Sequence, residues 1–250
     1  MTPLATYALR LGDDALVLSH RLGEWVTNAP QLEEDVALGN IALDLLGQAR
    51  SLLTYAGQVE GEGRDEDDLA YLRDERDFCN VHLVELANGD FAVSMARQLV
   101  FSTYQLALYE QLQSSTDETL AAVAAKAVKE VDYHRDHATQ WVLRLGDGTD
   151  ESHGRMQAGL DRVWPYVGEL FTTDGLEQAL VAEGVAADSS ALRPGWDGYV
   201  DAVLAEATLD RPEGLRTPPG GGRRGVHTEA MGYLLAEMQS LHRAHPGASW

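Results

Sequence analysis

Carboxylates and imidazoles with the spacing of metal ligands cluster between residues 129 and 137, which read Lys-Glu-Val-Asp-Tyr-His-Arg-Asp-His. Glu130 precedes His134 by four residues and His134 precedes His137 by three, so each pair can share one face of a helix. A carboxylate-bridged di-iron site in a four-helix bundle needs one Glu from each of two helices and a Glu-x-x-His pair from each of two others. The cluster is therefore only part of such a site, and the other helices decide whether the site is complete.

The same cluster can instead be an ordinary helix surface. In that interpretation its acids and His137 pair with the basic side chains of Lys126, Lys129 and Arg135, and each exposed pair contributes only about 0.3 to 0.5 kcal/mol. The acids concerned are Glu130, Asp132 and Asp136. An inward-facing His134 is then a hydrogen-bonded core histidine.

Helical periodicity dominates the chain and the alternating pattern of β-strands is scarce, which predicts an all-α fold. Apolar residues recur at three- and four-residue steps from Leu4 to Leu22, so the first helix is expected to end near Trp25. Further helices are predicted over residues 31–55, 67–86, 91–113, 117–145, 152–171 with a kink at Trp164-Pro165, 174–183, 196–209, and from a cap at His227 or Thr228 to about Leu241. Long helices joined mainly by short turns indicate a helical bundle with additional C-terminal helices, in one domain over residues 1–250.

Charge and composition argue against several classes of function. The formal net charge of −21 disfavours a nucleic-acid partner, because phosphate binding depends on clustered Lys and Arg. No stretch approaches the ~18 to 20 apolar residues needed to span a bilayer, and the N-terminus lacks a basic region followed by an apolar one. We therefore expect a cytoplasmic protein without membrane contact. Cys79 is the only cysteine, which excludes an internal disulfide and a zinc site made of thiolates.

Motifs along nearly the whole chain carry a resemblance to a known family. They are Leu11-Gly-Asp-Asp14, Ala42-Leu-Asp-Leu-Leu-Gly-Gln-Ala-Arg50, Arg73-Asp-Glu-Arg76, Lys129-Glu-Val-Asp-Tyr-His134, Leu145-Gly-Asp-Gly-Thr149, Glu183-Gly184, His227-Thr-Glu229, Ala236-Glu-Met-Gln239 and Pro246 to Trp250. With these motifs the chain resembles the non-catalytic, ferritin-like subunit of the bacterial phenylacetyl-CoA epoxidase, a multicomponent complex that oxygenates an aromatic ring. So many motifs in order make a chance similarity improbable.

The resemblance implies a catalytic partner. In that family the subunit pairs with a related one that holds a di-iron centre and oxidises phenylacetyl-CoA to its 1,2-epoxide, while a reductase subunit delivers electrons from NADPH. The metal-ligand positions of the catalytic partner match, in chain order, Asp14 or Ala15, then Leu45 and Gln48, then Ser102, and then Val131 and His134 in this chain. At most Asp14 and His134 could bind metal, and one acid with one imidazole cannot hold two irons. Leu45 and Val131 are expected to pack as apolar side chains.

The resemblance therefore implies a structural, scaffolding subunit of the epoxidase in phenylacetate degradation, with no catalytic residue, metal or cofactor of its own. Its expected partners are the di-iron subunit and the reductase, and in isolation it is expected to form a homodimer.

The segment from Thr217 to Gly225 is rich in proline and glycine and is predicted to be a flexible loop. Arg223 and Arg224 on it could contact the phosphates of phenylacetyl-CoA where subunits join, and the alternative is a simple tether.

Two other functions remain open at this point. The chain could be an autonomous di-iron or single-metal oxygenase that uses Glu130, His134 and His137 with acids from other helices. It could also be a ferritin-like iron-storage protein. Both need intact metal ligands, so the iron content of the purified chain separates them from a scaffold.

Overall fold

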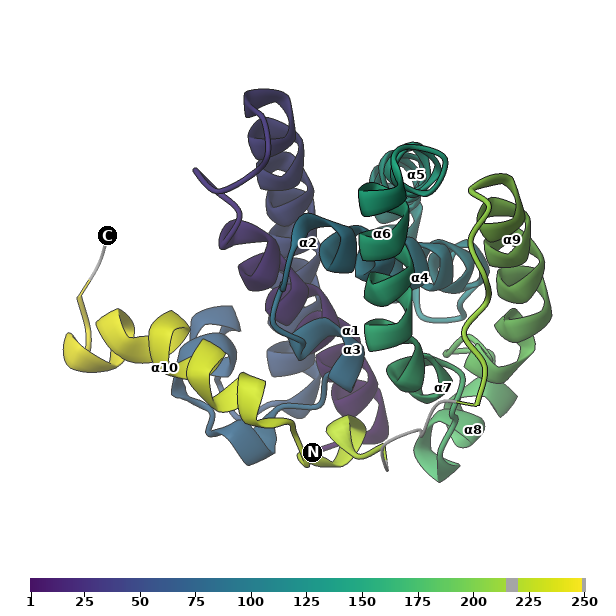
Figure 1. Cartoon of the computed structure of the whole chain (residues 1–250). Coiled ribbons are helices and arrows are strands. Elements are labelled where there is room, and N and C mark those ends of the chain that lie inside the picture. Colours follow the sequence, from purple (N-terminus) through teal and green to yellow (C-terminus); the bar gives the residue numbers. More distant parts are fainter. Residues whose placement is uncertain (215–219, 249–250) are drawn as a thin grey trace. The chain divides into compact units, whose positions relative to one another are not determined.

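The computed structural model of the chain describes residues 1–214 and 220–248, and every regular element in those ranges is a helix or a helical turn (Figure 1). Contacts between Cα atoms divide the chain into two compact units. Unit 1 comprises residues 1–87 and 220–250, and unit 2 comprises residues 88–219. The predicted all-α class is confirmed, whereas the single domain expected over residues 1–250 stays a prediction. In the described ranges, no helix is both long and apolar enough to cross a membrane.

The first helix of unit 1, α1 (Pro3–Gly23), is buried along almost its whole length. It packs along α2 (Leu32–Glu60), and the two helices approach so closely at Gly12 that a Cβ atom there would lie 2.9 Å from an α2 side chain. Asp13 and Asp14 are among the buried residues of α1. α1 therefore places two adjacent carboxylates inside the unit. A buried carboxylate is costly unless it is paired, so both need hydrogen-bonding partners of opposite charge.

The segment after α2 does not form the helix predicted over residues 67–86, so this prediction is wrong. It forms a π-helical turn, η1 (Asp68–Leu72), a 3₁₀ turn, η2 (Glu75–Asp77), and the short helix α3 (His82–Glu85). The cause lies in α1. The backbone N–H of Cys79 donates to the carboxylate of Asp13 (2.8 Å). That of Val81 donates to Asp14 (2.8 Å). Because these N–H groups are bonded to another helix, the backbone here cannot continue its own helical hydrogen bonds.

The chain returns to unit 1 with residues 220–244, which we call the C-terminal strap. Its elements are a 3₁₀ turn, η5 (Gly222–Arg224), and the helix α10 (Glu229–Ala244). α10 begins after Thr228, one of the two predicted caps. The flexible loop predicted over residues 217–225 is wrong for residues 220–225, which form an ordered turn. Residues 217–219 lie outside the described residues.

Two glycines allow the strap to lie directly on the backbone of the segment before α3. A Cβ atom at Gly222 would overlap the carbonyl oxygen of Asn80. A Cβ atom at Gly225 would overlap the carbonyl oxygen of Arg76, and Gly225 also has a positive φ of 71°, which disfavours any side chain. The glycine-rich sequence therefore serves close packing in this part of the strap.

The central helix of unit 2 is α4 (Phe91–Leu112), in which almost every residue is buried. It packs against α5, α6 and α9. The other elements of the unit are α5 (Glu118–Gly146), α6 (Asp150–Val163), η3 (Trp164–Tyr166), α7 (Val167–Leu170), α8 (Gly175–Ala182), η4 (Ser189–Leu192) and α9 (Arg193–Glu206). The 3₁₀ turn between α6 and α7 lies where the sequence predicts a kink, because proline interrupts the helical hydrogen bonds.

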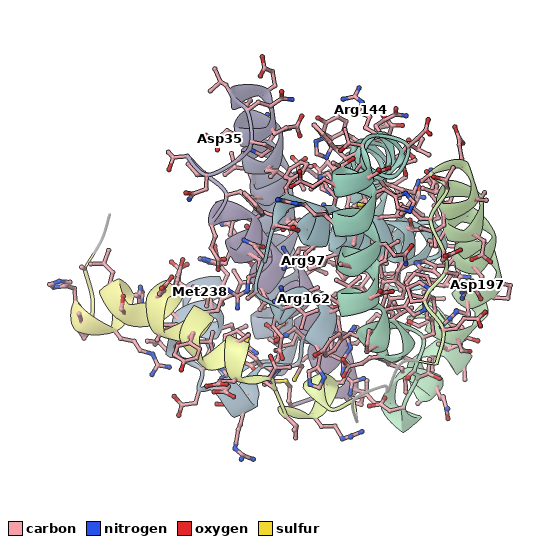
Figure 2. The ribbon with its side chains drawn as sticks, in the orientation of Figure 1. Asp35, Arg97, Arg144, Arg162, Asp197 and Met238 are labelled. Carbon is pink, nitrogen blue, oxygen red and sulfur yellow. The ribbon has the colours of Figure 1, made fainter. Side chains whose placement is uncertain are left out.

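Aromatic rings and a partly exposed set of charges join α9 to the rest of unit 2. Trp196 donates its indole N–H to the carbonyl oxygen of Val100 in α4 (2.9 Å), and its ring centroid lies 5.4 Å from that of Phe171. Asp197, which follows on α9, is labelled in Figure 2 and accepts hydrogen bonds from Arg193 and Arg211. The aromatic contacts lie inside the unit and the ion pairs lie at its rim.

Candidate functional site

Asp14 is the first of the predicted ligand positions, and the structure pairs it with an arginine from the C-terminal strap. Nη1 of Arg223 lies 3.0 Å from one carboxylate oxygen of Asp14, and Nη2 lies 2.8 Å from the other. Nη1 also donates to the carbonyl oxygens of Arg10 (3.1 Å) and Cys79 (3.0 Å). With the N–H of Val81, both oxygens of the carboxylate have donors. A guanidinium thus holds the acid that the family resemblance assigned to a metal-ligand position.

The electrostatics of Asp14 follow from its location. Its side chain is 4% exposed, and this burial raises its pKa to about 6 against the lowering effect of Arg223 and of the Val81 hydrogen bond. The neighbouring charge of Asp13 raises the pKa further. At neutral pH the carboxylate is still mainly ionised, so the guanidinium supplies the compensating positive charge.

Asp13, the second acid of the pair, has its own arginine. Both carboxylate oxygens of Asp13 accept hydrogen bonds from Arg73, one at 3.0 Å, and both side chains are almost completely buried. The guanidinium of Arg73 also lies over the ring of Phe78, 4.1 Å from its centroid. The family resemblance included Arg73 in a motif and gave it no role; its role here is to neutralise a buried carboxylate.

A third buried pair joins α3 to the C-terminal strap. Glu85 accepts hydrogen bonds from Nδ1 of His227 (2.9 Å), from Nδ2 of Asn80 (3.1 Å) and from the backbone N–H of Thr228 (2.6 Å). The other imidazole nitrogen of His227 lies 2.9 Å from the carbonyl oxygen of Phe78. Both ring nitrogens therefore face acceptors, which favours the doubly protonated imidazolium. Burial lowers the pKa of His227, but the hydrogen bond and charge of Glu85 outweigh burial, so the pKa is raised.

These six residues form one set of charges inside unit 1, which we call the polar core. Its members are Asp13, Asp14, Arg73, Glu85, Arg223 and His227. Three are anions that α1 and α3 bury, and three are cations, two of which come from the strap. Asp13, Arg73, Glu85 and His227 are not among the site residues predicted from the sequence. Their only signal is that Asp13, Arg73 and His227 lie in motifs of the family resemblance.

The two other ligand positions in unit 1 lie on α2. Leu45 and Gln48 are both buried there, at 1% and 4% exposure. Leu45 has no atom that can bind a metal, and it packs in the apolar interior as expected from its side chain. At the two positions that the family resemblance predicts for a Glu-x-x-His motif, this unit therefore has an apolar side chain and an amide.

The remaining positions lie in unit 2. Ser102 on α4 donates its hydroxyl to the carbonyl oxygen of Gln98 (2.5 Å), one turn earlier in the same helix. Val131 and His134 are both buried on α5. The ring of His134 lies 6.4 Å from that of Tyr133, measured between centroids. The buried face of α5 is therefore the one that carries the predicted positions.

The chemistry of these side chains does not fit a di-iron centre. Leu45 and Val131, which the family resemblance predicts at two of the carboxylate positions, offer no donor atom, while Asp14 already binds Arg223. Among residues 1–214 and 220–248, no three His, Cys, Asp or Glu side chains are grouped so that they could hold a metal ion.

Arg224 differs from its neighbour Arg223 because its guanidinium is exposed. Among the residues that the structure describes, its guanidinium donates only to the carbonyl oxygen of Gly220, within the same turn (3.1 Å). The guanidinium of Arg223, in contrast, is bound to Asp14 in the polar core. The contact of both arginines with coenzyme A phosphates stays a prediction, and Arg224 is the one whose charge is accessible.

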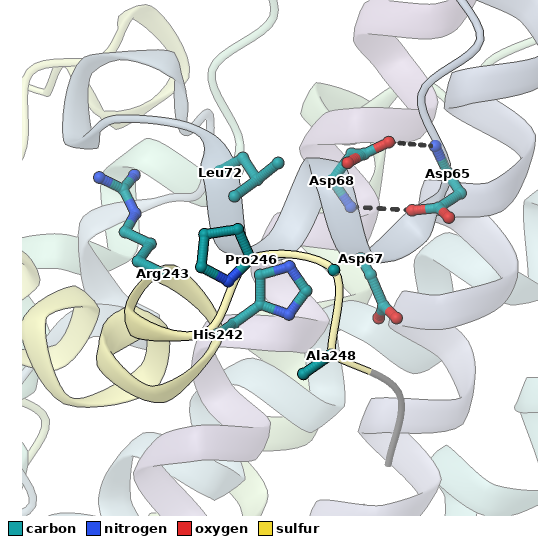
Figure 3. A pocket seen from close by; sticks show the side chains of 9 residues that line it. Asp65, Asp67, Asp68, Leu72, His242, Arg243, Pro246 and Ala248 are labelled. Carbon is teal, nitrogen blue, oxygen red and sulfur yellow. Dashed lines mark hydrogen bonds between the residues drawn. The ribbon is translucent and has the colours of Figure 1, made fainter.

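A surface pocket of about 500 Å³ lies in unit 1 beside the end of α10 (Figure 3). Asp65, Asp67 and Asp68 line one side and His242 and Arg243 line the other. Asp65 and Asp68 each accept a hydrogen bond from the other's backbone N–H, at 2.9 and 3.2 Å. These acids therefore stabilise the start of a helical turn, in keeping with a solvated acidic segment.

Comparison with known proteins identifies the family. The model of the phenylacetic acid catabolic protein family matches residues 1–250. One of the subunits of 1,2-phenylacetyl-CoA epoxidase from Escherichia coli (strain K12) is 50% identical to this chain, over 100% of each. This relative confirms the resemblance to an epoxidase subunit, and the family is ferritin-like, which confirms the predicted fold class. The chain belongs to the phenylacetic acid catabolic protein family.

Proposed function

We propose that the chain is the structural subunit of a phenylacetyl-CoA epoxidase complex that acts in phenylacetate degradation. The match to the Escherichia coli epoxidase subunit over the full length of both chains supports membership of such a complex. In this proposal a separate, related subunit holds the di-iron centre, and a reductase supplies it with electrons. The chain acts in the cytoplasm and carries no catalytic residue.

The observation that carries the structural role is the pairing of Asp14 with Arg223. A carboxylate that bridges or binds iron must direct its lone pairs to the metal, whereas both oxygens of Asp14 accept hydrogen bonds from Arg223 and Val81. Buried Leu45 and Val131 support the same conclusion at two other ligand positions. An apolar or internally paired side chain stabilises the fold at each of these sites.

A structural subunit of this kind assists catalysis by binding. If it buries a helical face of its catalytic partner, it stabilises the folded form of that partner by mass action. It can also help to shape the approach of the acyl-CoA substrate, to whose phosphates the exposed Arg224 could donate. Without its partner, the chain is expected to cover the same face by self-association.

The test is reconstitution. Epoxidation of phenylacetyl-CoA is measured with the catalytic subunit, the reductase and NADPH, with and without this chain, and iron is determined in each separated subunit. We expect activity to require the chain and iron to remain with the catalytic subunit. Full activity without the chain, or near-stoichiometric iron in the chain alone, would contradict the proposal, and the second result would favour an autonomous oxygenase.

A matched variant separates a structural role of Asp14 from a catalytic one. The double substitution Asp14→Asn with Arg223→Met removes both charges and keeps the side-chain volumes similar. We expect the complex to retain its activity with this variant, once circular dichroism and thermal melting show that it is folded. Loss of activity in a folded complex would contradict a purely structural role of the Asp14–Arg223 pair.

A further inference from the structure

Large apolar side chains lie exposed on the outward face of α2. Leu32, Val36 and Leu43 are 74%, 57% and 65% exposed, and their spacing of four and seven residues places them on one side of the helix. From residue 36 to residue 49, the sequence of α2 has a single charged residue, Asp44. On a protein in which 24% of the residues are charged, an exposed apolar strip of this kind indicates a surface that another chain covers.

The opposite face of the same helix is apolar too. Leu38, Ile41 and Leu45 are at most 1% exposed and pack in the interior of unit 1. A helix on the surface of a monomer has one apolar face, whereas a helix that is apolar all round is buried on every side. The interior of unit 1 accounts for one face of α2, and the outward face is left for an interaction with another chain.

Two glycines shape the outward face. Gly39 and Gly47 lie among the large side chains, and both have ordinary helical backbone, so the conformation of α2 does not require glycine. In the ranges that the structure describes, a Cβ atom added at either position would meet no atom within 4 Å beyond the adjoining residues and the helix backbone. Each glycine costs the helix about 0.5 to 1 kcal/mol relative to alanine. It leaves a hollow that can accept a large side chain of a second helix.

The large side chains and the hollows of this face fit each other when two copies of α2 pair antiparallel. In such a pair, a residue faces the one that lies equally far on the other side of the two-fold axis. An axis at residue 41 sets Leu43 of each copy over Gly39 of the other. The midpoint of Val36 and Gly47 lies between residues 41 and 42, so the same axis also sets Val36 over Gly47. One symmetric arrangement therefore fills both hollows of each copy.

The charged residues of α2 permit the same arrangement. The axis sets each Glu33 opposite Arg50 of the other copy. Arg50 donates to Glu66 at 3.3 Å, but its side chain is 69% exposed and a guanidinium has five N–H donors, so it can bind both acids. Asp44 is set opposite uncharged residues, and Asp35, which Figure 2 labels, accepts a backbone N–H of the preceding loop (2.7 Å). Because the acids at each end outnumber Arg50, the apolar contacts supply most of the affinity.

We infer that the outward face of α2 is the interface of a homodimer, in which two copies of this helix pair antiparallel about a two-fold axis near residue 41. A parallel pair would instead set each large side chain against its own copy and each hollow against a hollow. It would also bring the two Glu33 carboxylates together. The inference goes beyond the expected self-association, because it assigns the surface and the direction of the helices. It concerns this chain alone and does not rest on the proposed function.

A change of size at one glycine tests the interface in the full-length chain. Gly39→Leu overfills a hollow of the dimer, whereas in the single chain the new side chain meets open space, so the fold should be retained. Sedimentation equilibrium gives the dissociation constant of the dimer. We expect Gly39→Leu to raise it about 100-fold, because the symmetric dimer contains the overfilled hollow twice. The control Gly154→Leu changes an exposed glycine of α6 that also faces open space, and it should leave the constant within about twofold.

An exchange of the large and the small residue tests the antiparallel pairing. Leu43→Gly alone removes a large side chain and should also weaken the dimer. In the combined variant, Gly39→Leu with Leu43→Gly, the large side chain of each copy again faces a hollow, because positions 39 and 43 lie opposite each other. The exchange leaves the composition of the helix unchanged, and circular dichroism checks that each variant is folded. We expect the combined variant to dimerise with a dissociation constant within about fivefold of the wild type.

Several results would contradict the inference. One is a wild-type chain that stays monomeric at every concentration up to about 0.1 mM. Another is a dimer that Gly39→Leu does not weaken, or that Gly154→Leu weakens as much. If the folded exchange variant stayed monomeric, the antiparallel pairing would be wrong. If Gly39→Leu left the dimer intact and prevented only the binding of the catalytic subunit, the occupant of this face would be that subunit and the inference would be wrong.

Discussion

The two units of this molecule stabilise their interiors with different interactions. Unit 1 buries the ion pairs of the polar core, of which Asp13 with Arg73 and Glu85 with His227 are almost completely shielded from solvent. Unit 2 buries aromatic rings around α4, and the ion pairs that surround Asp197 on α9 are partly exposed; Arg193 and Asp197, for example, are 34% and 30% exposed. Buried charges depend on their partners far more than apolar side chains do. The integrity of unit 1 therefore depends on a few specific contacts, and that of unit 2 on distributed packing.

The difference also concerns distance along the chain. Asp14 and Arg223 are 209 residues apart, and Glu85 and His227 are 142 residues apart, so the polar core closes unit 1 only when the C-terminal strap is in place. Arg193 and Asp197 lie on the same helix. Asp14, the ligand position predicted in α1, is thus one of the residues that hold the strap in place.

Removal of Arg73 tests this difference most severely. Arg73→Ala leaves the carboxylate of Asp13 buried without its cation, and we expect a loss of about 3 to 5 kcal/mol in the free energy of unfolding. Urea denaturation followed by circular dichroism gives this value. As a control, Asp13→Asn combined with Arg73→Met removes both charges and should recover a substantial part of the loss. A loss below about 1 kcal/mol in the single variant would mean that the pair is not shielded as described.

The pH dependence of unit 1 is the second test. Because the pKa of Asp14 is raised to about 6 in the folded state, the folded chain holds this proton more tightly than the unfolded chain does. Its contribution to stability is complete below about pH 4 and is lost as the pH rises through 6. Between about pH 4 and 7, Asp14→Asn should remove at most ~3 kcal/mol of this change. The pKa of His227 is also raised, so His227 also makes the free energy of unfolding fall as the pH rises, and it does so equally in the wild type and in Asp14→Asn.

The measurement is chemical denaturation of the wild type and of Asp14→Asn at several pH values. The informative quantity is the difference between the two pH profiles, because other titrating groups cancel in it. Parallel profiles would show that Asp14 titrates normally in the folded protein and that its burial in the polar core is incorrect.

Unit 2 should respond much less to the loss of an arginine. Arg211 pairs with Asp197 (2.6 Å) and Asp201 (2.5 Å) and lies over Trp164, yet it is partly exposed. Arg211→Ala is expected to cost about 1 kcal/mol or less. Burial raises the pKa of Asp197, but hydrogen bonds from Arg211 and Arg193 outweigh it and lower the pKa. Nuclear magnetic resonance titration of the variant should therefore find the pKa of Asp197 higher than in the wild type. If Arg211→Ala lowered the free energy of unfolding as much as Arg73→Ala does, the contrast between the units would be wrong.

The long helices could be predicted from sequence because their signals are local. The helix predicted over residues 117–145 is α5 (Glu118–Gly146), and the one predicted over 91–113 is α4 (Phe91–Leu112). Apolar periodicity and capping residues lie within the helix itself, so no tertiary information is needed. The helix predicted over residues 67–86 failed because the side chains that redirect its backbone belong to α1.

The site was predictable only in its parts. The family resemblance singled out Asp14 as a ligand position and the glycine-rich loop suggested Arg223 as a phosphate contact, but no periodic pattern links residues so far apart. The pairing emerges only from the tertiary fold. Glu85 lies in no motif, and the motif that contains His227 did not indicate a site, because a buried ion pair depends on which segments meet and not on local spacing.

A double-mutant cycle on Asp14 and Arg223 tests the central claim, that this acid is held by the strap in a structural ion pair. The free energy of unfolding is measured at neutral pH for the wild type, Asp14→Asn, Arg223→Met and the double variant. We predict a favourable coupling energy of about 2 kcal/mol. The double variant should therefore lose less free energy of unfolding than the sum of the losses in the two single variants. A coupling energy below about 0.5 kcal/mol would contradict the account, because Asp14 would then be free to serve another ligand.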